Sequence, residues 1–136
     1  MKPEQAEQLR LLSIFHYVFA GVLALVACLP LIHVGLGLAM VLAPRQFGGH
    51  GEPPPAFLGW FFVVTGGVFI LAGWLAAALI AWAGRCLARR RQYTYCLVMA
   101  GVACVFMPLG TLLGVFTILL LAKPEVKAAF GPVVSA

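Results

Sequence analysis

The stretch AFLGWFFVVTGGVFILAGWLAAALIAWAG, residues 56–84, decides the fold of this chain, because none of its side chains is charged. As an α-helix it is about 43 Å long, which exceeds the roughly 30 Å hydrocarbon layer of a bilayer. Trp60 and Trp82 are separated by about 33 Å along such a helix. Tryptophan prefers membrane interfaces, so the stretch predicts a transmembrane helix with these two residues as interface anchors.

Two further apolar stretches, residues 9–43 and 93–122, flank it and are each long enough to cross a bilayer once. We therefore expect an all-α integral membrane helical bundle with three long transmembrane helices in a single domain, residues 1–136. Proline removes a backbone donor and bends a helix, so the first and third helices should be kinked at Pro30 and Pro108. A re-entrant turn near either proline, giving four crossings, stays open.

Composition supports the same class. Hydrophobic residues make up 63% of the chain and charged residues 10%, whereas soluble domains are about a quarter charged. The net charge of +5 does not indicate a nucleic-acid partner, because four of the nine basic residues gather at the edge of an apolar stretch, between Arg85 and Arg91. The expected surroundings are the lipid bilayer.

The connections predict a topology. Residues 44–55 hold four prolines, which favour an irregular outer loop, whereas residues 85–92 contain no helix breaker and form a basic turn. Arginines near a span are retained in the cytoplasm, so residues 85–92 and the N-terminus should be cytoplasmic. Arg85, Arg89, Arg90 and Arg91 either set this orientation or hold anionic lipid headgroups. Three spans would leave Lys123 and Lys127 outside, against that rule, so the side of the C-terminus stays open.

Chemistry-bearing patterns are scarce. No charged residue lies in the centre of a span, which argues against small multidrug exchangers, since these rely on an intramembrane glutamate. The sequence has no nucleophile elbow, phosphate loop, carboxylate pair or metal-ligand cluster. We therefore expect neither an enzyme nor a metal site.

Two histidines, His16 and His33, lie within the first apolar stretch. They are 17 residues apart, about 25 Å on a straight helix, so one helix cannot bring them to a single ion. The simpler interpretation is a neutral imidazole bonded to a neighbouring helix, with no cofactor. The alternative is a haem held by these histidines from two helices or two chains.

Small residues at helical spacing predict close helix packing. Gly110 and Gly114 form a GxxxG pattern in the third stretch. Similar strips occur in the other two stretches, and their residues are Gly73, Ala77, Gly35 and Ala39. Such strips suit internal packing and contacts between subunits alike.

The chain resembles a loosely defined set of small bacterial multi-span membrane proteins with no assigned activity. The likeness is carried by SIFHY at 13–17, RCLARRR at 85–91, PLGTLLGVFT at 108–117 and KPEV at 123–126. The resemblance implies a bacterial inner-membrane location and transfers no catalytic residue.

The function expected from these features is a structural or assembly subunit that packs against other membrane helices, in a homo-oligomer or a larger complex. A homo-oligomeric channel is the first alternative, and its polar lining would have to come from Thr65, Thr111, Thr117 or the two histidines. A haem-binding electron-transfer subunit is the second alternative.

Overall fold

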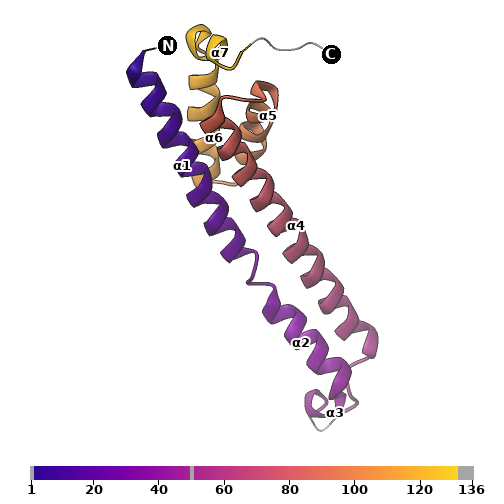
Figure 1. Cartoon of the computed structure of the whole chain (residues 1–136). Helices are drawn as coiled ribbons and strands as arrows, with labels where there is room; N and C mark the ends of the chain where they lie inside the picture. Colours follow the sequence, from indigo (N-terminus) through magenta and orange to yellow (C-terminus); the bar gives the residue numbers. More distant parts are fainter. Residues whose placement is uncertain (1, 50, 132–136) are drawn as a thin grey trace. The chain divides into compact units, whose positions relative to one another are not determined.

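The computed structural model describes residues 2–49 and 51–131, and every regular element in that part of the chain is an α-helix. In chain order the helices are α1 (Pro3–Val26), α2 (Leu31–Leu42), α3 (Pro44–Phe47), α4 (Ala56–Arg89), α5 (Tyr93–Ala103), α6 (Leu109–Leu121) and α7 (Pro124–Ala129) (Figure 1). The predicted all-α class is confirmed. Two helical stretches, Pro3–Leu42 and Ala56–Arg89, are long and apolar enough to cross a membrane.

The chain divides into two compact units. The terminal unit contains the described residues up to Val22 and those from Ala76 onward, and the loop unit contains residues 23–75. Both α1 and α4 begin in one unit and end in the other. Within each unit the first apolar stretch packs antiparallel to α4.

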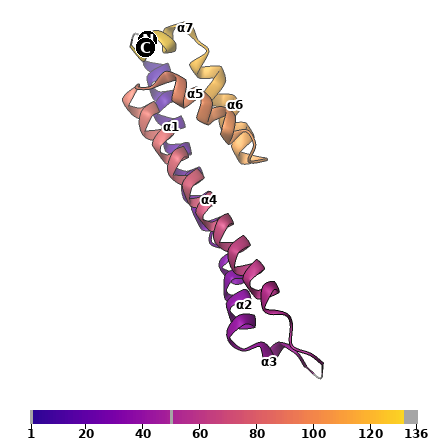
Figure 2. The same ribbon diagram turned by 90° about the vertical axis from the view of Figure 1, so that its right-hand side faces the viewer.

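The loop unit is built on α2 and the first half of α4, which lie side by side (Figure 2). α1 ends at Val26 and α2 begins at Leu31, so the helix is interrupted next to Pro30, where the sequence predicts a kink. Across this break the amides of Leu31 and Ile32 bond to carbonyls three residues earlier, at 3.0 and 3.2 Å. Proline has no N–H to donate, which is the physical reason for the change of bonding pattern.

Glycines set the distance between α2 and α4. A Cβ added to Gly37 would lie 2.6 Å from the Gly59 carbonyl oxygen, and one added to Gly66 would lie 2.8 Å from Val34 Cγ2. The described residues of the loop unit that are buried are Ala27, Gly37, Gly59 and Gly66. The two backbones therefore approach closely, and the large side chains of this unit stay at its surface.

The terminal unit has a conventional core. Its buried cluster consists of Leu9, Cys86, Leu87, Cys96, Leu120, Leu121 and Val126. α4 continues through the basic segment to Arg89, as the absence of a helix breaker predicts. Arg90 and Gln92 then adopt left-handed backbone angles, with φ of 51° and 56°, and the chain reverses into α5.

The third apolar stretch differs from the single kinked helix expected over residues 93–122. α5 ends at Ala103, the chain turns, and α6 returns antiparallel to it, so that the Tyr93 hydroxyl donates to the Leu121 carbonyl at 3.0 Å. The turn is closed by the Thr111 hydroxyl, which donates to the Cys104 carbonyl at 2.7 Å. With 11 and 13 residues, the two helices are about 16 and 20 Å long, so neither alone reaches across a bilayer.

The reason for the reversal lies in Pro108 and the two glycines of the GxxxG pattern. Pro108 cannot donate the hydrogen bond that would continue α5. Added Cβ atoms on Gly110 and Gly114 would collide with the carbonyl oxygens of Ala103 and Ala100. These glycines leave the space in which α6 folds back on α5. The chain reversal near Pro108, left open by the sequence, is the arrangement found.

Candidate functional site

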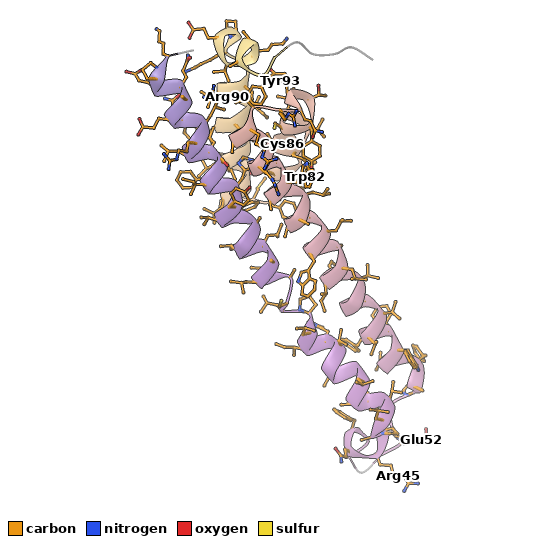
Figure 3. The ribbon with its side chains drawn as sticks, in the orientation of Figure 1. Arg45, Glu52, Trp82, Cys86, Arg90 and Tyr93 are labelled. Carbon is orange, nitrogen blue, oxygen red and sulfur yellow. The ribbon has the colours of Figure 1, made fainter. Side chains whose placement is uncertain are left out.

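The terminal unit carries most of the positive charge. Eight of the nine Lys and Arg residues belong to it, since only Arg45 lies in the loop unit. The predicted basic residues Arg85, Arg89, Arg90 and Arg91 are all exposed, on the last turns of α4 and just after them. Figure 3 labels Arg90 in this part of the molecule and Arg45, which belongs to α3. Most of the cationic side chains of the protein therefore belong to the terminal unit.

Two arginines that are far apart in the sequence, one on α1 and one directly after α4, come together in this unit. Arg10 of α1 and Arg90 line one hollow of about 610 Å³, together with Glu7. The buried side chains of Leu9 and Leu87 form its floor. Two guanidinium groups over an apolar floor can bind a phosphate or carboxylate at the surface of the unit.

The short helix α7 is fixed beside the start of α1. The Gln5 amide donates to the Glu125 carboxylate at 2.7 Å, and the Val126 side chain is fully buried. The Lys127 ammonium lies 5.7 Å from the centre of the Tyr93 ring, a cation–π contact. The basic residues after α6 thus share one end of the terminal unit with the N-terminus of α1.

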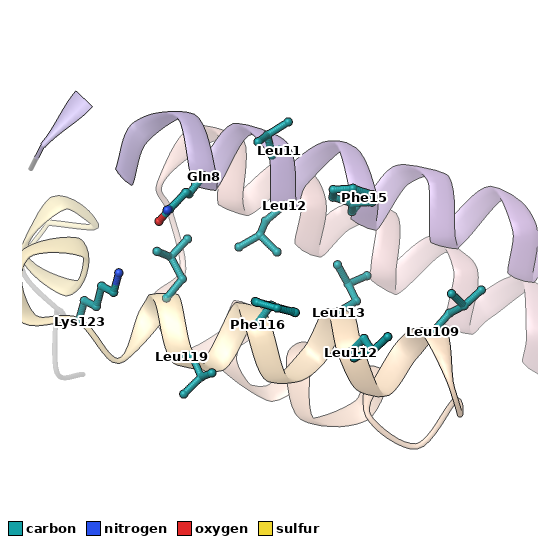
Figure 4. A pocket seen from close by; sticks show the side chains of 11 residues that line it. Gln8, Leu11, Leu12, Phe15, Leu109, Leu112, Leu113, Phe116, Leu119 and Lys123 are labelled. Atoms are coloured by element: carbon teal, nitrogen blue, oxygen red, sulfur yellow. The ribbon is translucent and has the colours of Figure 1, made fainter. Parts of the chain in front are cut away.

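An apolar groove of about 740 Å³ runs between α1 and α6. Leucine and phenylalanine side chains from both helices point into it, and Gln8 and Lys123 stand at one end of it (Figure 4). Most of the lining residues on α6 are largely exposed. Leu109 lies at the other end of the groove, next to the hairpin turn. Sequence reasoning missed this groove because it depends on the return of α6 towards α1.

Some of the predicted packing residues contact other parts of the chain, whereas others have free space beside them. Gly110 and Gly114 face α5 as described above, Gly73 faces Ala27, and Ala77 is buried. Gly35 has no atom near the position of a Cβ, and Ala39 is half-buried. Most of the strips therefore contact other helices of the same chain.

Sequence reasoning named Gly73 but missed two glycines that continue its strip along α4. Gly59, Gly66 and Gly73 repeat every seven residues, and each of them faces residues 27–41. A seven-residue spacing returns to the same side of a helix and favours a left-handed crossing. This repeat was visible in the sequence, but the sequence alone did not show which helix it faces.

The histidines occupy unlike surroundings. His16 is 1% exposed, and its Nδ1 bonds to the Leu12 carbonyl oxygen at 2.9 Å, while its Nε2 has no hydrogen-bond partner. His33 lies in the other unit, is exposed, and stacks on Phe62 at a ring distance of 6.1 Å. Among the residues that the structure describes, no three His, Cys, Asp or Glu side chains gather as metal ligands.

Two of the three threonine hydroxyls proposed for a channel lining bond to the backbone. Thr117 donates to the Leu113 carbonyl of its own helix at 2.7 Å, and Thr111 closes the hairpin turn. Thr65 is half-buried on α4. Such bonds satisfy the hydroxyl locally.

The tryptophans stand on the surface of α4. Trp60 is 54% exposed and Trp82 is 55% exposed, so neither indole is covered by the described part of the chain.

No protein-family model, curated protein or solved structure matches this chain. The function is therefore inferred from the geometry described above.

Proposed function

We propose that this protein is an integral membrane protein that acts as an assembly subunit, packing against other membrane helices. The observation that carries the membrane assignment is the composition of the loop unit's interior. Only glycine and alanine are buried among its described residues, while both of its tryptophans and most of its phenylalanines and leucines are exposed.

In water the folded loop unit would not be stable. Burying one large apolar side chain contributes about 1.5–3 kcal/mol, whereas ordering the backbone costs about 1–2 kcal/mol per residue. With no large side chain buried among its described residues, the loop unit lacks a comparable hydrophobic term. In lipid the exposed side chains are already solvated, backbone bonds form within each helix, and glycine contacts draw the helices together.

The low burial of the two long helices also supports a membrane location. In the most apolar windows of Pro3–Leu42 and Ala56–Arg89, 11% and 17% of the residues are buried. The core helix of a soluble protein would be mostly covered by protein. Acyl chains are the covering that fits these two helices.

The hairpin changes the expected number of crossings. We infer two crossings, by the α1–α2 stretch and by α4, with the α5–α6 hairpin entering and leaving on one side. In this arrangement Lys123 and Lys127 lie on the same side as Arg85–Arg91. The conflict between three spans and the preference of basic residues for the cytoplasm then disappears.

An assembly role is supported by the surface that the loop unit leaves uncovered. Its two longer helical segments, α2 and the first half of α4, pack against each other, and the described residues of the unit supply no third helix of comparable length. Gly67 on α4 and Gly35 on α2 have open space where a Cβ would be. Open glycines on a membrane helix allow a further helix to approach closely.

Crosslinking in native membranes, followed by mass spectrometry of the adducts, tests this role. Gly67→Leu should lower the yield of adducts several-fold, because the leucine fills the space that a partner helix needs. Ala72→Leu, at an exposed position on the same helix, should leave the yield unchanged. A protein that remains monomeric and free of adducts contradicts the assembly role but not membrane insertion.

A further inference from the structure

The geometry points to a lipid-binding site in the groove between α1 and α6, which we propose holds one anionic phospholipid. One of its two acyl chains lies along the groove, and its phosphate lies beside Lys123 and Gln8. This inference rests on the proposed membrane insertion and goes beyond the assembly role, because it names a ligand of the terminal unit.

The walls of the groove suit a hydrocarbon chain. Nine of its eleven lining residues are Leu or Phe, contributed by both helices. None of the lining residues is Gly or Ala. Membrane helices approach one another closely through small residues. A groove walled by long, branched and aromatic side chains therefore fits a thin, flexible acyl chain better than a second helix.

The two ends of the groove differ in polarity. Lys123 is the one charged residue that lines it, and the Gln8 amide lies at the same end, across from it on α1 (Figure 4). No acidic side chain is among the lining residues. An ammonium and an amide can both donate hydrogen bonds to a phosphate oxygen, and the positive charge favours an anionic headgroup.

The groove is long enough to hold an acyl chain that spans one leaflet. From Lys123 to Leu109 along α6 is about 21 Å, and half of the hydrocarbon layer is about 15 Å. The lysine end is also the end at which α7 packs beside the start of α1. A lipid whose headgroup lies at that interface would therefore extend its chain towards the hairpin turn.

Photo-crosslinking in nanodiscs tests the site. The full chain is incorporated into discs of phosphatidylcholine that contain a small fraction of diazirine-labelled lipid, either phosphatidylglycerol or phosphatidylcholine. Adducts are mapped by mass spectrometry. The expected result is a preference for labelled phosphatidylglycerol, with adducts on residues 109–120 and on the facing residues of α1.

Two pairs of variants locate the headgroup and the chain. Lys123→Gln should lower the preference for phosphatidylglycerol about fivefold, the usual effect of one basic residue near a charged lipid. Lys127→Gln is the control, because that ammonium lies over Tyr93 and not in the groove. Leu112→Trp should block adducts on α6, whereas Val115→Trp, on the same helix but outside the lining, should not.

The other outcomes overturn the proposal. Equal labelling by both lipids, unaffected by Lys123→Gln, contradicts a site for an anionic headgroup. Protein–protein adducts mapped to the groove would show that a second copy fills it. Loss of phosphatidylglycerol adducts on addition of inorganic phosphate would show that the site binds a free anion. Failure of the chain to enter the discs would refute membrane insertion itself and is read separately, from the disc fraction.

Discussion

Single glycines determine how closely α2 and α4 pair. Gly37 and Gly59 meet backbone to backbone, so an added methyl group finds an atom that cannot rotate away. Gly35, two residues earlier on the same helix, has open space around it. Replacing each of the two glycines by alanine therefore distinguishes two effects. Both variants change helix propensity, but only the variant at Gly37 disturbs the contact between the helices.

Gly37→Ala should destabilise the protein by about 1–3 kcal/mol relative to Gly35→Ala, as overpacking of a tight contact usually does. Gly35→Ala should be neutral or slightly stabilising, because alanine is the better helix former. The free energy of unfolding is measured in detergent micelles titrated with dodecyl sulfate. Equal stability of the two variants would show that α2 and α4 do not pair through Gly37.

Ser13 ties α1 to α4 in the terminal unit. Its hydroxyl donates to the Gly84 carbonyl at 2.7 Å and is buried. Ser13→Ala should cost about 0.6 kcal/mol, the average for hydrogen bonds between membrane helices. Thr117→Val is the contrast, because the Thr117 hydroxyl bonds within its own helix and its loss should matter less. The same micelle titration measures both variants, and a larger loss for Thr117→Val would contradict this ranking.

The α5–α6 hairpin is the element that differs most from the prediction based on the sequence. It brings Tyr93 and Leu121 into hydrogen-bond contact, whereas one continuous helix would hold them about 42 Å apart. Basic residues on either side of the hairpin thereby come to one end of the terminal unit. The groove beside α1 exists because α6 returns in this way.

The distance between Thr94 and Ala122 tests the hairpin. Both positions are exposed and accept spin labels as cysteine variants of a chain whose four native cysteines have been replaced. Neighbouring helices lie about 8–10 Å apart axis to axis, so the double electron–electron resonance distance should be short. A distance near 42 Å, the length of 28 helical residues, would indicate the single long helix instead.

Across the whole molecule, the sequence predicted the helical class and the extent of the long helices because hydropathy and helix breakers are local. It left a turn near Pro108 open but did not decide between a hairpin and one kinked helix, since the turn residues Cys104–Val105–Phe106–Met107 are as apolar as the helices beside them. It did not identify Gly59 and Gly66 as packing residues, because no small residue follows either of them four positions later. The groove depends on such long-range pairing, which one sequence does not reveal.

Solubility follows from the same surface. Exposed leucine, phenylalanine and tryptophan side chains occur along α1, α2 and α4. Soluble monomers rarely expose apolar patches larger than a few hundred Å². The purified chain should precipitate when detergent is removed and remain folded when it is exchanged into lipid. Circular dichroism and sedimentation measure this, and a folded, dispersed chain in plain buffer would contradict lipid-facing helices.

The most direct test of two crossings plus a hairpin is the labelling of single cysteines in sealed spheroplasts with a membrane-impermeant maleimide. Suitable exposed positions are Gln46 in α3, Ala88 near the end of α4 and Ala128 in α7. Gln46→Cys should react from outside, while Ala88→Cys and Ala128→Cys should react only after lysis. Reaction of Ala128→Cys from outside would restore three crossings, and protection of all three positions until lysis would show that the long helices do not cross the membrane.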